Sequence, residues 1–169
     1  METKEFEKLQ DCIQDSFIQM SAYAIEGVNA NRGGPFGAAV IQKQENGKYK
    51  MISQGQNTVV GEKDPTCHAE VNAIRSACKK LNRFELHDCI LITTAKSCPM
   101  CLSTCCWAQI PTVYYALEYE FASKAGFKDA NILDYFLGKN HLIKEVKVEC
   151  EQAKEPFEVW MNKEDKILY

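Results

Sequence analysis

The sequence lacks the features that would place it in a membrane or outside the cell. No apolar run approaches the roughly 18 residues of a membrane span, and the first residues, METKEFEKLQ, carry no apolar signal-peptide core. No internal repeat and no low-complexity linker divides the 169 residues. We therefore expect a cytoplasmic protein with one domain over residues 1–169 and no membrane partner.

An excess of positive charge is also missing. The chain has 20 Lys and Arg against 23 Asp and Glu, so its net charge is −3. Proteins that bind nucleic acid need clustered Lys and Arg for the phosphates. The charge balance therefore argues against a nucleic-acid partner and favours a small-molecule substrate.

Cysteine, by contrast, is abundant. Nine cysteines, an odd number, in a chain without a secretory signal favour reduced thiols over a disulfide framework. Four of them fall in apolar patterns, where free cysteine behaves as a small hydrophobe: Cys12, Cys78, Cys89 and Cys150. Cys98 and Cys101 have the spacing of metal ligands and need another explanation.

Strand and helix patterns alternate along the chain. Apolar residues at three- and four-residue spacing predict an amphipathic helix within the first thirty residues. β-branched and apolar runs predict five strands, at 36–43, 49–55, 88–94, 112–118 and 142–150. Further helices are expected from near 68 and 98, and around 121–125, 132–137 and 156–164. This order predicts an α/β sandwich with a mixed, mostly parallel five-stranded sheet, opened by an antiparallel hairpin.

Two of the expected helices begin with residues that bind metals. His68 and Glu70 open one of them, in DPTCHAEVNAIRSA, and Cys98 and Cys101 open the other, in CPMC. Two cysteines three apart point the same way from one helical turn. His68 and Glu70 are two apart, so they converge only if His68 stands at the non-helical entrance of its helix.

One imidazole and two thiolates are the protein ligands typical of a catalytic zinc site, which keeps its fourth position for water. Glu70 then serves as the general acid and base beside that water. Two alternatives stay open. The zinc could be structural, with a fourth ligand from Cys67, Cys105 or Cys106, or the two motifs could coincide by chance.

The HAE and CPMC motifs resemble those of the cytidine-deaminase-like superfamily. Further segments resemble small bacterial guanine deaminases: EGVNANRGGPFGAAVI, GQN, DPTCHAEVNAIR, CPMCL, AGFKDANI and PFEVW. The resemblance implies a three-layer α/β/α fold, one Zn²⁺ per subunit, and hydrolysis of guanine to xanthine and ammonia.

The same resemblance implies several substrate contacts. Asn57 would hydrogen-bond the purine edge, Ala69 would contact the base, and Phe36 and Trp107 would line an apolar slot for it. Asp129 would be a second acidic group that helps protons reach the leaving ammonia. From the residues alone, Asn57 could equally be a turn residue, Asp129 a helix N-cap, and the two aromatic residues core.

The resemblance also implies a homodimer. In this family two chains exchange their C-terminal segments, here about 144–169, so the partner subunit's Tyr169 would close the pocket. The chain departs from the family at Lys96-Ser97, where Glu-Pro usually precedes the first cysteine. A shifted specificity is therefore an alternative: guanosine, cytosine, an aminotriazine or a tRNA adenosine. A catalytically impaired zinc-binding homologue is another.

Overall fold

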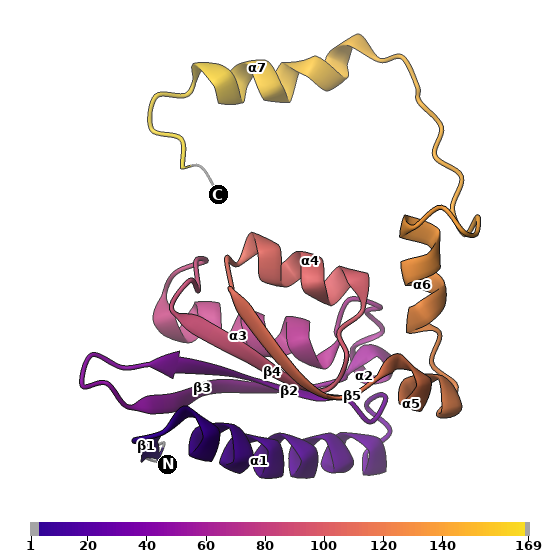
Figure 1. Ribbon diagram of the computed structural model, residues 1–169. Coiled ribbons are helices and arrows are strands. Elements are labelled where there is room, and N and C mark those ends of the chain that lie inside the picture. The colour runs from indigo at the N-terminus through magenta and orange to yellow at the C-terminus, as the bar shows by residue number, and fades with distance from the viewer. Residues whose placement is uncertain (1–3, 168–169) are drawn as a thin grey trace.

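The protein, represented by a computed structural model, is described for residues 4–167 and is built on one mixed sheet (Figure 1). Its five strands lie in the order β1-β3-β2-β4-β5. Their bounds are Glu5–Phe6 for β1, Gly37–Lys43 for β2, Tyr49–Gln56 for β3, Cys89–Ala95 for β4 and Thr112–Leu117 for β5.

Helices cover both faces of this sheet, which confirms the three-layer α/β/α architecture. Helix α1 (Leu9–Asn29) lies along one face, and α3 (Ala69–Leu81) and α4 (Pro99–Trp107) lie on the other (Figure 1). Successive residues of β2 point to opposite faces: Ala39 and Ile41 pack in the cluster under α1, whereas Ala38 and Val40 pack in the cluster under α3. Burial on both sides explains the unbroken apolar run of this strand.

The strand directions differ from the prediction. Only β4 and β5 pair in parallel, and the pairs β1–β3, β2–β3 and β2–β4 are antiparallel. The expectation of a mostly parallel sheet was therefore wrong. The crossover through α3 does make β4 run in the same direction as β3, but it places β4 beside β2, which runs the opposite way.

The strand expected at 142–150 is absent from the described part of the chain. Residues 142–150 form no helix or strand, and β1 provides the fifth strand instead. β5 consequently remains an edge strand with a single neighbour, β4. The prediction failed because a strand needs a partner, and none lies within reach of this segment in the same chain.

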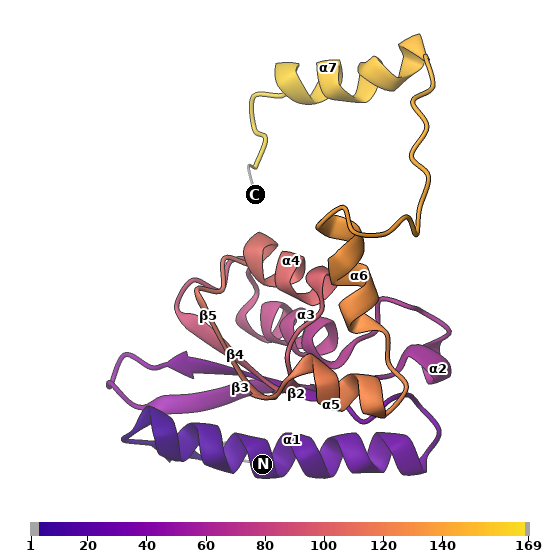
Figure 2. The same ribbon diagram turned by 45° about the vertical axis from the view of Figure 1, so that its right-hand side comes forward.

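The remaining elements are short helices. They are α2 (Val59–Glu62), α5 (Tyr119–Lys124), α6 (Asp129–Phe136), the 3₁₀ helix η1 (Glu151–Lys154) and α7 (Glu155–Asn162). Figure 2 shows α7 standing apart from the sandwich, joined to it through a long extended segment. None of the helices within residues 4–167 combines the length and apolarity needed to cross a membrane.

A glycine lets α3 lie close against β3. A Cβ atom on Gly55 would stand 2.2 Å from the carbonyl oxygen of Ala69 and 2.6 Å from the backbone nitrogen of Ala73. Only glycine fits such a close approach of two backbones. Since Ala69 is the first residue of α3, Gly55 fixes the height of that helix's N-terminus above the sheet.

Candidate active site

Three side chains converge where α3 and α4 begin. The Nδ1 atom of His68 lies 3.8 Å from Sγ of Cys98 and 3.6 Å from Sγ of Cys101, and the two sulfur atoms are 3.6 Å apart. Among the described residues, these three form the one group of His, Cys, Asp or Glu whose ligand atoms gather closely enough to hold a metal ion. The convergence predicted from two separate motifs is confirmed.

The group fits zinc. Tetrahedral zinc with Zn–S bonds of about 2.3 Å and Zn–N bonds of about 2.0 Å places its ligand atoms roughly 3.5–3.8 Å apart. The three distances match that range. The alternative of a structural site with a fourth cysteine is wrong, because no other cysteine belongs to the group within the described chain. Cys67, which directly precedes His68, donates its thiol hydrogen to Oδ2 of Asp64, with 3.3 Å between the sulfur and oxygen atoms.

Both helices present their first ligand from the N-cap position. His68 (φ −68°, ψ 156°) and Cys98 (φ −69°, ψ 166°) are extended residues that precede the first helical turn, and neither side chain caps the helix. The extended backbone turns each side chain out of the helix and toward the other motif. His68 therefore precedes its helix in a non-helical conformation, as the two-residue spacing between His68 and Glu70 required. Pro99 follows as the first residue of α4, where its lack of an N–H group costs nothing.

The ionisable groups of this cluster are electrostatically coupled. Hydrogen bonding to the Cys101 thiol, helped by the His68 ring, lowers the pKa of Cys98 well below that of a free thiol. Interaction with Cys98 in turn raises the pKa of His68. A cysteine whose thiolate form is stabilised is a competent metal ligand, because the ligand form of cysteine is the thiolate.

Glu70 is buried at the floor of the site. It is the second residue of α3 and only 5% exposed. Burial raises the pKa of its carboxyl, and the negative charge of Cys98 raises it further, whereas the nearby His68 opposes the shift. A carboxyl with a raised pKa holds a proton more readily than an ordinary glutamate does, which suits a general acid and base.

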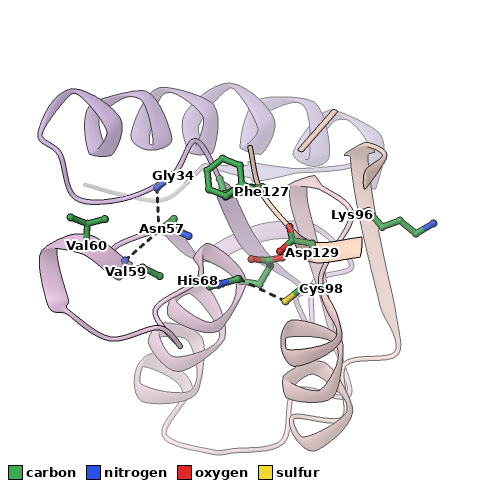
Figure 3. A pocket seen from close by; sticks show the side chains of 11 residues that line it. Gly34, Asn57, Val59, Val60, His68, Lys96, Cys98, Phe127 and Asp129 are labelled. Atoms are coloured by element: carbon green, nitrogen blue, oxygen red, sulfur yellow. Dashed lines mark hydrogen bonds between the residues drawn. The ribbon is translucent and has the colours of Figure 1, made fainter. Parts of the chain in front are cut away.

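A cavity of about 210 Å³ opens over Glu70 and the metal ligands (Figure 3). Its lining combines apolar walls with a few polar groups, which is typical of a small-molecule site. The lining residues are Gly34, Phe36, Asn57, Val59, Val60, His68, Glu70, Lys96, Cys98, Phe127 and Asp129.

Asn57 enters this cavity with a fixed orientation. Its Oδ1 atom accepts hydrogen bonds from the backbone N–H groups of Gly34 and Val59, both at 3.2 Å (Figure 3). An amide oxygen has two lone pairs, so both are used by the backbone. The side chain therefore offers only its NH₂ group to a ligand, and the ligand atom that meets it must be an acceptor. Asn57 is thus both the turn residue and a cavity residue.

Two phenylalanines form the apolar wall. The rings of Phe36 and Phe127 meet edge to face, with centroids 4.7 Å apart and planes at 79°. Gly34 makes room for them, because a Cβ there would lie 2.7 Å from the Phe127 ring. Phe36 was predicted and Phe127 was missed. The sequence feature that could have identified Phe127 is its position in GFKD, two residues before the predicted Asp129.

Asp129 also reaches the cavity, from the first turn of α6 (Figure 3). It is the first helical residue and Lys128 holds the N-cap position, so the N-cap interpretation of Asp129 was wrong. Burial raises the pKa of Asp129, and the negative charge of Cys98 adds to this shift. The site therefore holds two acidic groups with raised pKa values.

Two residues expected at the substrate do not line this cavity. Trp107 lies near the C-terminal end of α4, 66% exposed, and lines a separate hollow with Phe84. Trp107 is nine positions after Cys98, a rise of about 13.5 Å along a helix, so one end of α4 cannot carry both. Ala69 is fully buried in the core at the start of α3. The predicted Tyr169 lies outside the described residues.

Lys96 borders the cavity but directs its charge away from it (Figure 3). Its ammonium group lies 3.2 Å from the Glu118 carboxylate and 5.3 Å from the ring centres of Tyr115 and Tyr119. These neighbours hold the charge on the outer surface. The substitution at this position therefore adds no positive charge at the floor of the site.

Comparison with known proteins places this geometry in a family. Residues 13–117 match the cytidine and deoxycytidylate deaminase zinc-binding region. The chain is 42% identical over 148 residues to a guanine deaminase of Bacillus subtilis, covering 86% of this chain and 92% of that protein. The crystal structure of a guanine deaminase from Bacillus subtilis superposes with a TM-score of 0.81 and 38% identity, covering 96% of this chain and 99% of that one.

A second kind of relative matches only in part. A tRNA-specific adenosine deaminase of Aquifex aeolicus is 37% identical over 82 residues, which cover 48% of this chain and 51% of that protein. The likeness to the RNA-directed enzyme is thus confined to half of each chain, whereas the likeness to guanine deaminase extends over nearly the whole length.

Proposed function

The chain belongs to the guanine deaminase family, within the cytidine and deoxycytidylate deaminases, and we propose that it hydrolyses guanine to xanthine and ammonia. One observation carries the proposal. The buried carboxyl of Glu70 faces the same small cavity as the zinc-binding residues, and Asn57 and two aromatic rings line that cavity as well.

The residues divide the reaction between them. His68, Cys98 and Cys101 would hold zinc, which would supply a Lewis acid that makes water nucleophilic at neutral pH. Glu70 would accept one proton of the attacking water and pass it to the ring nitrogen beside the amino-bearing carbon. The second proton of that water, carried by Glu70 or Asp129, would reach the amine as its C–N bond breaks, so that ammonia leaves and the new carbonyl remains.

Recognition of the base rests on shape and on one polar contact. Phe36 and Phe127, packed edge to face, form an apolar wall against which a planar ring can pack. The Asn57 NH₂ group, its only hydrogen-bonding group left for a ligand, donates to an acceptor on the purine edge. A purine with a carbonyl oxygen or ring nitrogen at that edge can accept this hydrogen bond, whereas a purine with an amino group there cannot.

A tRNA substrate is disfavoured by charge. Lys96 is the one Lys or Arg that lines the described cavity, and its ammonium is already paired with Glu118. Binding an RNA backbone needs several free cations around the site. The net charge of −3 points the same way.

The arrangement of the C-terminal segment supports an exchanged homodimer. Its apolar side chains are exposed to solvent: Leu142, Ile143, Val146, Val148, Phe157, Val159 and Met161. The extended segment 142–150 has a strand-like sequence but no strand partner, while β5 has a free edge. We infer that residues 142–150 of one subunit pair with β5 of the other, which completes the sheet that each chain leaves open. The partner subunit's Tyr169 closing the pocket belongs to the same proposal.

The experiment is to follow ammonia release by the zinc-loaded protein from guanine, guanosine, cytosine and adenine in separate reactions. We expect release from guanine. Release from another amine but not from guanine would overturn the substrate assignment and leave the zinc chemistry in place. The buried Ser97 hydroxyl, which lies near the Glu70 carboxyl, and Lys96 would then be the first positions to examine. A cytoplasmic location stays a prediction.

A further inference from the structure

Tyr119 of α5 holds the backbone that delivers the first cysteine ligand. Its hydroxyl donates a hydrogen bond of 2.7 Å to the carbonyl oxygen of Ser97, the residue directly before Cys98. The bond is partly buried. Tyr119 does not line the cavity, and its hydrogen bond reaches the site through the backbone of residue 97.

The segment from Lys96 to Cys98 needs such a restraint. It connects the end of β4 to the start of α4, and Ser97 stands where a proline would fix φ near −65°. On its entry side, the N–H of Lys96 donates to the carbonyl of Leu117 at 2.8 Å. Beyond that bond, this segment meets α5 and its N-cap residue through the Tyr119 hydrogen bond, the Lys96–Glu118 ion pair and the Lys96 ammonium 5.3 Å from the centre of the Tyr119 ring.

Magnitudes favour the tyrosine over the ion pair. The Lys96 and Glu118 side chains are 39% and 56% exposed, and exposed pairs of this kind contribute little. A partly buried hydrogen bond that fixes a metal ligand commonly changes metal affinity tenfold or more when it is lost. From this geometry, which rests on the proposed zinc site, we infer that Tyr119 is a positioning residue that keeps Cys98 in place to retain zinc.

The test is the rate at which zinc is released to an excess of a chromogenic chelator. Tyr119→Phe removes only the hydroxyl, and we expect about tenfold faster release than from the wild-type protein. Lys96→Met should change the rate less than fivefold. Tyr23→Phe is the matched control, because Tyr23 lies on α1 and its hydroxyl makes no hydrogen bond within residues 4–167.

Thermal unfolding of the zinc-free proteins separates positioning from a general loss of stability. Equal release rates in Tyr119→Phe and Tyr23→Phe would overturn the inference. So would faster release accompanied by a fall of more than about 10 °C in the Tm of the zinc-free protein, because the whole fold would then be weakened. Zinc release does not depend on the substrate, so this outcome is independent of whether guanine is deaminated.

Discussion

His68 and Cys98 occupy equivalent positions in two different helices, and their Nδ1 and Sγ atoms lie 3.8 Å apart. Each is the N-cap residue of its helix, and neither caps it. N-cap positions prefer Ser, Thr, Asp or Asn, whose oxygen accepts a hydrogen bond from the first turn. Both helices therefore forgo a stabilising cap so that a metal ligand can stand at their entrance.

This relationship predicts that Cys98→Ser separates stability from metal binding. A serine oxygen at the extended N-cap can accept a backbone N–H of the first turn of α4, which is worth about 1 kcal/mol. The zinc-free variant should therefore melt about 2–4 °C above the zinc-free wild type, and it should no longer retain zinc through dialysis.

Calorimetry and metal analysis of the same samples provide the check. Cys106→Ser, an exposed position on the same helix, is the control and should alter neither property. If zinc-free Cys98→Ser melts at a lower temperature than the zinc-free wild type, the serine does not stabilise α4 as an N-cap, and the prediction is contradicted.

The fold should tolerate a substitution of Asn57 that keeps the side-chain oxygen and removes the NH₂ group, but activity should fall. Asn57→Asp retains an oxygen for the Gly34 and Val59 N–H groups but removes the NH₂ group. We expect kcat/KM for guanine to fall about 10- to 100-fold, the effect of losing a good hydrogen bond, while the Tm stays within a few degrees. Asn57→Ala should lower both, because two backbone N–H groups lose their partner. Equal Tm losses in the two variants would contradict the assigned orientation.

Gly55 should be intolerant of a side chain. In Gly55→Ala the new methyl would press on the carbonyl of Ala69 and the backbone nitrogen of Ala73, so α3 must shift. Overpacking of this kind costs about 1–3 kcal/mol, and here it also moves the entrance of the helix that carries His68. Denaturant unfolding measures the loss. Gly61→Ala is the control, since its Cβ meets no atom closer than 3.5 Å.

The proposed exchange of C-terminal segments predicts which residues hold the dimer. Val146 and Val148 would share one face of the added strand, and Lys147 the other. Val148→Asp would bury an unpaired charge if that face packs against a second subunit, so it should shift the protein toward monomer. Lys147→Asp should leave the dimer intact. Light scattering coupled to gel filtration distinguishes the two, and a dimer that survives Val148→Asp would argue against this face as the contact.

Sequence reasoning found the chemistry better than the architecture. The grouping of His68, Cys98 and Cys101 and the position of Glu70 beside them were predictable because zinc accepts few residue types and their spacing limits the possible geometry. The strand directions were not predictable, because a strand–helix–strand pattern does not say which strand of the sheet the second strand pairs with. The segment 142–150 has a strand pattern, but no strand within residues 4–167 pairs with it, so the pattern alone led to a wrong prediction. Phe127 was missed and Trp107 misplaced because an aromatic residue near a motif carries no sign of which way it faces.

The central claim is that Glu70 moves the protons of a guanine hydrolysis at this zinc site, and one comparison tests it most directly. Ammonia release from guanine is measured for the wild-type protein and for Glu70→Gln, with zinc content determined for both. We predict equal zinc content and a fall in kcat of about 10²- to 10⁴-fold, because glutamine fills the same buried space but cannot carry the proton. Release from guanine at an undiminished rate by zinc-loaded Glu70→Gln would contradict the mechanism.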